Sequence, residues 1–256
     1  MDETLTLAGP TFESRLRAPA AVALAGAAIA IVSVLAILAA GWGNRAGWWD
    51  YRFAFTVLRW AAWIGLGAGL LAGIGGTLAI AGAPPRRVSA LALAGVVLGA
   101  LVFGIPWAYS ARRSAPINDI TTDTANPPRY VDIAPLRAGA PVKMDYGGEE
   151  TAAIQRKAYP DIAPATLGVP RDQAFERALA AARSLGWTIV ASVPAEGRIE
   201  ATDSTLFMGF TDDIVIRVQA EGTGSRVDVR SHSRVGRGDF GTNAKRVRAF
   251  LAKLGR

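Results

Sequence analysis

The residues best able to do chemistry are gathered near the C-terminus, in an aspartate pair and in the stretch RSHSRVGRGDFGTNAKR that spans residues 230–246. Guanidinium groups, hydroxyls and the backbone N–H groups of glycine-rich turns together suit a site for an anion or a polar head group. The candidate binding residues are Asp212, Asp213, Arg230, Ser231, Ser233, Arg234, Arg237, Asp239, Asn243 and Arg246.

The same residues also suit a structural role, which we favour. Arg230 and Arg234 stand four positions apart where a strand leaves into a loop, and the aspartate pair begins the strand expected to lie beside it. Arginine–carboxylate pairs are often bidentate and can fix a loop. The sequence therefore predicts a buried ion-pair and turn network that holds the sheet to the last helix, with a ligand site as the alternative.

A hydrolase is the third hypothesis. His232 is the only histidine, and with Ser231 or Ser233 and with Asp239 it could imitate a catalytic triad. Adjacent residues of a strand point to opposite faces, however, so Ser231 and His232 would not face each other. A single histidine without any cysteine cannot build a usual transition-metal site. We therefore expect no enzymatic activity, no cofactor and no metal.

The elements that must position these residues begin at Arg171. Apolar residues at helical spacing predict a helix that ends at Gly186, and a second set near the C-terminus predicts a final helix. Between them, alternating patterns and short turns predict four strands, over residues 187–193, 198–204, about 212–218 and 226–233. The first strand is expected to place Trp187, Ile189 and Ala191 on one face. The predicted fold class is α+β, with a four-stranded antiparallel sheet and two covering helices.

A proline-rich segment precedes this domain, from Ser114 to about Pro170. Proline at this density blocks helices and central strands alike, but the segment is too apolar for a free linker. We expect a strap packed on the domain over 114–170, with a short helix over 149–157, followed by the α+β domain proper over 171–256.

Three apolar stretches fill the first 113 residues, over about 20–40, 60–84 and 88–111. Each is long enough to cross the ~30 Å hydrocarbon core. The first exceeds the apolar length of a signal peptide and lacks a good cleavage site, so we expect an uncleaved helix. Glycines recur every four residues in the second and third stretches, which suits close packing within the bundle or a homo-oligomer.

The net charge of +7 does not indicate a nucleic-acid partner. Nine arginines and four acidic residues lie in the first 113 residues, whereas 19 basic and 17 acidic residues follow, so much of the excess flanks the membrane. Arginines are nearly equal on the two sides of the expected spans, so the positive-inside rule leaves the orientation open.

The sequence DDIVIR followed by RSHSRVGRGDFGTNAKR resembles the signature of the DUF1499 family, which comprises bacterial and plastid proteins of unknown function. The resemblance extends from about Ala115 to the C-terminus and includes PINDITTDTANPP and AYPDIAP. Some members resemble exported lipoproteins, so the resemblance implies an extracytoplasmic domain and a cytoplasmic N-terminus. It implies no activity.

These observations predict a multi-pass protein of the bacterial inner (plasma) membrane with a periplasmic C-terminal domain. We expect a non-catalytic interaction or envelope-associated module, and the alternative is a binding module for a lipid or small anionic ligand. The expected partners are the lipid bilayer, another membrane or envelope protein, and a second copy of the chain through small-residue helix faces.

Overall fold

The computed structural model describes residues 12–80, 85–110 and 114–255. The chain divides into two compact units, Met1–Ala111 and Arg112–Arg256. Each unit is described below by itself.

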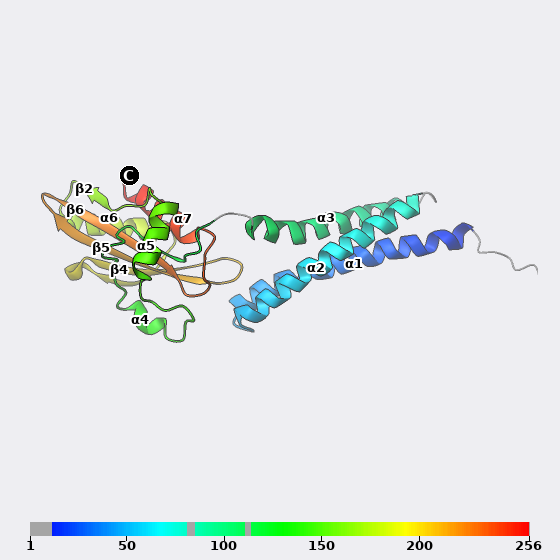
Figure 1. Cartoon of the computed structure of the whole chain (residues 1–256), viewed down its shortest axis with the longest axis horizontal. Coiled ribbons are helices and arrows are strands. Elements are labelled where there is room, and N and C mark those ends of the chain that lie inside the picture. The colour runs from blue at the N-terminus through cyan, green and yellow to red at the C-terminus, as the bar shows by residue number, and fades with distance from the viewer. Residues whose placement is uncertain (1–11, 81–84, 111–113, 256) are drawn as a thin grey trace, which may run out of the picture. The chain divides into compact units, whose positions relative to one another are not determined.

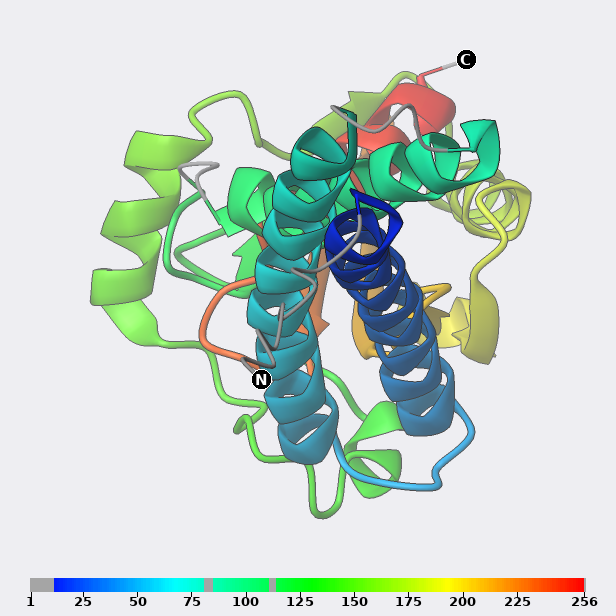
Figure 2. The same cartoon turned by 90° about the vertical axis from the view of Figure 1, so that its right-hand side faces the viewer.

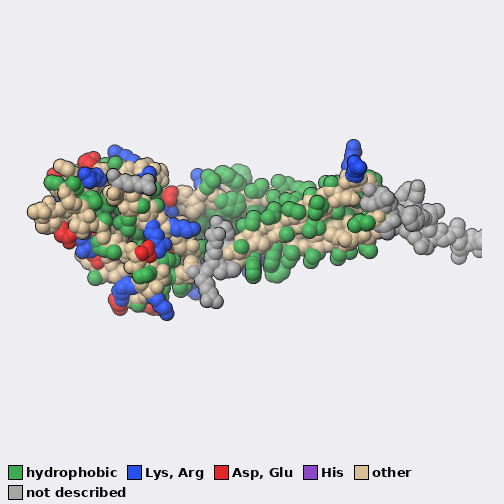
Figure 3. Space-filling model, turned by 90° about the horizontal axis from the view of Figure 1, so that it is seen from above, with side chains coloured by type: hydrophobic (Ala, Val, Ile, Leu, Met, Phe, Trp, Pro, Cys, Tyr) green, Lys and Arg blue, Asp and Glu red, His purple; other side chains and the backbone are tan. Residues whose placement is uncertain are grey.

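The first unit consists of three long helices, α1 (Phe12–Arg45), α2 (Tyr51–Ile80) and α3 (Arg86–Ser110) (Figure 1). By length and composition, all three are long and apolar enough to cross a membrane, which is consistent with the expected spans. The second helix begins at Tyr51, well before the expected start, and the expected ends at Pro84 and Ala111 lie outside the described residues. In the space-filling view, hydrophobic side chains cover the visible flank of these helices (Figure 3).

Glycines let the three helices approach one another closely. A Cβ atom at Gly99 would lie 2.5 Å from the backbone oxygen of Gly65, and one at Gly95 would lie 2.9 Å from the Cα atom of Ala27. Only a residue without a side chain fits at such contacts. The repeated glycines of α2 and α3 therefore pack helices of the same chain, and α1 and α2 lie side by side in both cartoon views (Figures 1 and 2).

The second unit is built on an antiparallel sheet. Its four long strands are β3 (Thr188–Val193), β4 (Arg198–Ser204), β5 (Thr211–Glu221) and β6 (Gly224–Ser233), with a short 3-10 helix, η1 (Pro194–Glu196), between the first two. The helices α6 (Arg171–Ser184) and α7 (Thr242–Leu254) pack on one face of this sheet. The α+β class, the four predicted strands and the two covering helices are thereby confirmed, but the sheet itself is larger than predicted.

The proline-rich segment is more structured than a strap. It contributes β1 (Asp119–Thr121), α4 (Ile133–Leu136), α5 (Gly148–Ala158) and β2 (Ala165–Leu167). Both short strands pair antiparallel with β6, so the complete sheet has six strands, in the order β1-β6-β5-β4-β3 with β2 also on β6. The expected helix over residues 149–157 is α5.

The face of the sheet that α6 and α7 cover is apolar. Ile214, Ile216 and Val218 of β5 alternate along it, as do Val227 and Val229 of β6, and all five are fully buried. Trp187 stacks on Phe250 of α7 with their ring centroids 5.6 Å apart. The period of two in the sequence thus identified the core face correctly.

Strand β3 departs from its expected pattern. A β-bulge interrupts its pairing with β4 between Ile189 and Ala191. Because the bulge inserts one extra residue, Ala191 pairs with Glu200 instead of continuing the face of Ile189. The expectation that Trp187, Ile189 and Ala191 share one face was therefore wrong.

The opposite face of the sheet is largely polar, and ionisable residues of three strands point to it, with Val215 among them. The ionisable residues are Glu200, Asp213, Arg217, Arg226, Asp228, Arg230 and His232. The segment over residues 123–147, which includes α4, covers this face: Tyr130 donates a hydrogen bond to the Asp213 carbonyl, and Glu200 accepts bonds from the Val131 and Ile133 N–H groups. We call this covering segment the strap.

Candidate functional site

The aspartate pair of β5 points to two different faces of the sheet. Asp212 lies opposite Ser233, and Asp213 lies opposite His232. Since neighbouring residues of a strand alternate in direction, the single network expected from the sequence is split in two. One half lies under the strap, and the other faces α7.

Arg230 forms the centre of the network under the strap. Its Nε and Nη2 atoms donate to the two carboxylate oxygens of Asp119, at 2.9 and 2.7 Å, and the remaining donors reach the carbonyls of Pro128 and Met144. Both partners of this bidentate pair are buried. The aromatic rings of Tyr130 and Tyr146 lie 5.0 and 5.5 Å from the guanidinium carbon, close enough for cation–π attraction.

Asp213 is completely buried and binds two arginines. Arg137 of the strap donates to one oxygen at 2.9 Å, and Arg234 donates to the other at 2.7 Å. Arg137 also donates to the carbonyls of Val142 and Ser233, which fixes the strap against the end of β6. The expected pairing of Arg234 with the aspartate pair is thus present, whereas Arg230 takes Asp119 instead.

The other half of the network joins β5 and β6 to α7. Arg246 lies 2.8 Å from Asp212, and it donates to the Asn243 amide oxygen at 2.8 Å. Ser231 donates to the same amide oxygen at 2.6 Å, and the Asn243 amide nitrogen donates to the Ser233 hydroxyl at 2.8 Å. This half holds the sheet to the last helix through buried polar contacts.

Asp239 and Arg237, both in the loop between β6 and α7, have different roles. The Asp239 carboxylate accepts hydrogen bonds from the N–H groups of Gly241 and Asn243, which stabilises the start of α7. Arg237 is exposed, and within the described ranges it makes no ion pair or hydrogen bond. The candidate residues therefore do not converge on one open site.

His232 is buried beside Asp119 and lacks a catalytic arrangement. Its Nδ1 atom lies 3.5 Å from the Asp119 carboxylate and has no hydrogen-bond partner among the described residues. Burial, together with the charges of Arg137 and Arg230, lowers the pKa of His232 to about 2, so the imidazole is neutral at physiological pH. Ser231 points to the opposite face, where it binds Asn243.

Sequence reasoning missed several charged residues under the strap. Asp228 is fully buried and lies 2.9 Å from Arg217, which also lies 3.0 Å from Asp123 of the strap. Glu200 has no exposed surface and accepts strap N–H groups at 2.7 Å. The signal was present in the sequence for β6, because Arg226, Asp228 and Arg230 alternate there with two valines.

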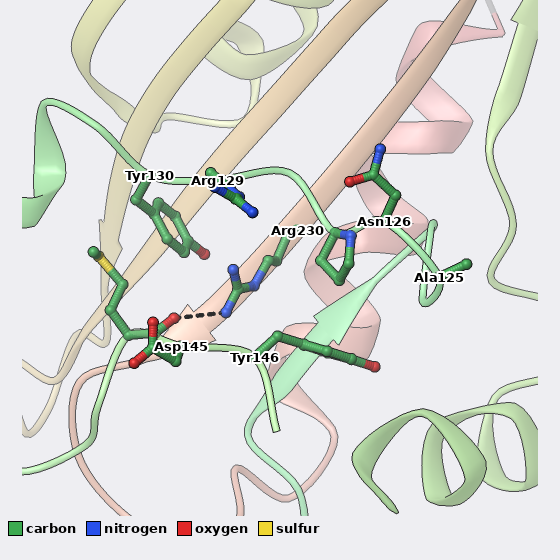
Figure 4. A pocket seen from close by; sticks show the side chains of 9 residues that line it. Ala125, Asn126, Arg129, Tyr130, Asp145, Tyr146 and Arg230 are labelled. Atoms are coloured by element: carbon green, nitrogen blue, oxygen red, sulfur yellow. Dashed lines mark hydrogen bonds between the residues drawn. The ribbon is translucent and has the colours of Figure 1, made fainter. Parts of the chain in front are cut away.

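A half-open pocket of about 560 Å³ lies between the strap and Arg230 (Figure 4). It is lined by Ala125, Asn126, Pro127, Arg129, Tyr130, Met144, Asp145, Tyr146 and Arg230. Burial raises the pKa of Tyr146 to about 12, so its phenol stays protonated at neutral pH. Arg129 is exposed and has no ion-pair partner in the described part of the chain. The sequence did not predict this pocket.

Comparison with known proteins gives one match. A family model described as a protein of unknown function (DUF1499) matches residues 119–254. No curated protein and no solved structure matches the chain. Within the residues that the structure describes, no group of three or more His, Cys, Asp or Glu side chains could hold a metal ion.

Proposed function

Since the chain belongs to the DUF1499 family of unknown function, we propose that it is an inner-membrane protein that presents a non-catalytic interaction module outside the cytoplasm. The family model spans more than half of the chain and covers the whole sheet together with the strap. The three apolar helices supply the membrane attachment.

One observation carries the non-catalytic part of this proposal: most polar groups of the signature are bonded within the domain, with Arg237 and the His232 Nδ1 atom as exceptions. Arg230, Asp213 and Arg246 each have charged partners within the domain. The only histidine is buried, and the Ser231 hydroxyl, a candidate nucleophile of a triad, points to the opposite face of the sheet. Groups bonded in this way stabilise the fold of the domain. They offer neither an activated nucleophile nor a general base.

The side of the membrane is proposed from the family resemblance. Arginines alone leave the orientation open, because the two sides of the spans carry similar numbers. Resemblance to exported proteins favours an extracytoplasmic domain and a cytoplasmic N-terminus. Association of two copies through the helices stays a prediction. The glycines described above pack against other helices of the same chain.

Crosslinking in native membranes followed by affinity purification tests the interaction module. The bait is the full chain with a C-terminal tag, and the matched control is a tagged chain that ends at Arg113. We expect the full chain to recover a specific membrane or envelope protein that the control does not recover. Equal recovery by both chains would place the interaction on the helices and contradict the proposal.

The pocket favours a second function, which is binding of a small anionic ligand. Arg129 offers an unpaired guanidinium at its mouth, and the tyrosine rings supply an apolar wall. Asp145 also lines the pocket and would oppose an anion. Inorganic phosphate should raise the melting temperature of the full chain and of Arg237→Ala, but not of Arg129→Ala. A shift that survives Arg129→Ala, or no shift at all, would rule out anion binding in this pocket.

A further inference from the structure

Two loops at one end of the sheet expose large apolar side chains. The loop between β4 and β5 has the sequence TLFMGF over residues 205–210, and 76% of Leu206 is exposed. The loop between β6 and α7 covers residues 234–241, and 53% of Phe240 is exposed. Phe240 also has a φ of 54°, the only positive value at a non-glycine residue in the described ranges. A bulky residue held in that conformation costs free energy and often marks a functional position.

Strand pairing places both loops at the same end of the domain. Ser204 pairs with Thr211 where β4 ends and β5 begins, and Asp212 pairs with Ser233 where β6 ends. We call these two segments, residues 205–210 and 234–241, the end loops.

The chain also enters the domain at this end. Asp119, the first residue of β1, pairs with His232 near the end of β6. The Asn118 side chain donates to the Gly236 carbonyl, and a Cβ atom at Gly238 would lie 3.7 Å from the Cα atom of Pro116. The entering segment therefore runs directly beside the second end loop.

Only a short stretch of chain links this end of the domain to the last helix of the first unit. Three residues separate Ser110, the last residue of α3, from Ser114. A chain extends at most about 3.6 Å per residue, so Ser114 stays within about 15 Å of the helix end. This limit follows from chain length alone.

The charge around the end loops suits lipid phosphates. Arg237 in the second loop and Lys245 in the first turn of α7 are exposed, and neither makes an ion pair within the described ranges. Asp239 is the acidic residue of that loop, and its carboxylate is bonded to the start of α7. Exposed apolar side chains flanked by basic ones are typical of surfaces that bind the membrane interface.

We propose that the end loops form a lipid-binding surface that docks the domain on the bilayer its own helices span. Leu206 and Phe240 enter the head-group region, while Arg237 and Lys245 bind lipid phosphates. The docking depends on the spans and not on which side of the membrane the domain occupies. It therefore rests on the membrane attachment proposed above, but not on the interaction role.

The chain contains no cysteine, so a single cysteine can report on one position of the full-length protein. Leu206→Cys and Phe240→Cys are labelled with an environment-sensitive fluorophore and placed in nanodiscs of phosphatidylglycerol and phosphatidylcholine with doxyl-labelled lipid. Thr223→Cys is the matched control, because it lies exposed in the hairpin at the other end of the sheet. Side chains at the interface enter about 5–10 Å, so both test positions should show at least about twofold stronger quenching than the control.

Charge reversal provides a second arm of the experiment. In anionic nanodiscs, Arg237→Glu combined with Lys245→Glu should lower quenching at both labels by about half. Arg177→Glu, an exposed arginine on α6, should leave it unchanged. Quenching equal to that at position 223 would overturn the proposal. A blue-shifted label that doxyl lipid does not quench would do so as well, because protein and not lipid would then cover the loops.

Discussion

At the scale of single residues, buried ion pairs stabilise the polar face under the strap, although the Arg137 Nε and His232 Nδ1 atoms have no hydrogen-bond partner among the described residues. A buried charge is costly unless it is paired and its remaining donors are bonded. Arg230 meets this condition, because Asp119 and the carbonyls of Pro128 and Met144 take its donors. Asp213 meets it with two arginines. The stability of the domain should therefore depend on each partner in proportion to its burial.

Three alanine substitutions should rank by that burial. Arg230→Ala leaves Asp119 buried and unpaired and should lower the free energy of unfolding by about 3–5 kcal/mol. Arg234→Ala should cost less, about 1.5–3 kcal/mol, because Asp213 keeps Arg137. Arg237→Ala should stay within about 0.5 kcal/mol. Pulse proteolysis of the full chain across a urea series measures all three, and an Arg230→Ala chain as stable as Arg237→Ala would refute the ranking.

His232 should make the domain sensitive to mild acid. Above pH 6.5 the imidazole is neutral in both states and contributes nothing to the pH dependence. As the pH falls, the unfolded chain binds a proton near the ordinary pKa of 6.5, while the folded chain does not until about pH 2. Stability should therefore fall by at most about 1.4 kcal/mol per pH unit, or about 2 kcal/mol by pH 5.

The control is His232→Gln, which cannot titrate. Burial raises the pKa of Asp119 and of Asp212, and these groups act in the opposite direction at lower pH. Both aspartates are present in the unchanged protein and in His232→Gln. The difference between the two free energies of unfolding therefore gives the contribution of His232. Parallel stability curves for the two chains between pH 7 and 5 would show that His232 is not held neutral.

At the scale of elements, the sequence predicted what local patterns determine. The alternation in β5 and β6 and the short turn between them identified both strands and their core face. By contrast, β1 and β2 are three residues long and lie among prolines, so no local period marks them. Their pairing with β6 joins Asp119 to His232 and Ala165 to Val227, which are far apart in the sequence, and only tertiary packing decides it.

The sequence predicted which residues form the candidate network, but not which of them pair with one another. The sequence placed Asp212 and Asp213 with Arg230 and Arg234, but alternation sends the two aspartates to opposite faces. Asp119 then binds Arg230, because β1 adds to the edge of β6. A charge partner that lies 111 positions away cannot be chosen from spacing alone.

The segment over residues 114–170 should be necessary for folding of the second unit. A fragment over residues 114–256 contains the whole sheet and should fold in solution. A fragment over 171–256 lacks β1 and β2 together with Asp119 and Arg137, so Arg230 would be left without its carboxylate. Circular dichroism during thermal unfolding compares the two fragments. Equal melting temperatures would show that residues 114–170 are only a linker.

At the scale of the whole molecule, the two units differ in composition and in role. The first unit is apolar, carries its glycines at helix contacts and supplies the membrane attachment. The second unit is rich in ion pairs, and its polar groups are largely bonded within the domain. The account of function depends on the domain lying outside the cytoplasm, where an envelope protein could reach it.

Fusion of a reporter after Arg256 tests this claim most directly. Alkaline phosphatase is active only outside the cytoplasm, whereas green fluorescent protein exported through the general secretion route stays dark. The same reporters fused after Ile80, between the second and third spans, serve as the matched control, because that position should lie in the cytoplasm. The account predicts active phosphatase and dark fluorescent protein at Arg256, with the reverse at Ile80. Fluorescence at Arg256 with inactive phosphatase would contradict it.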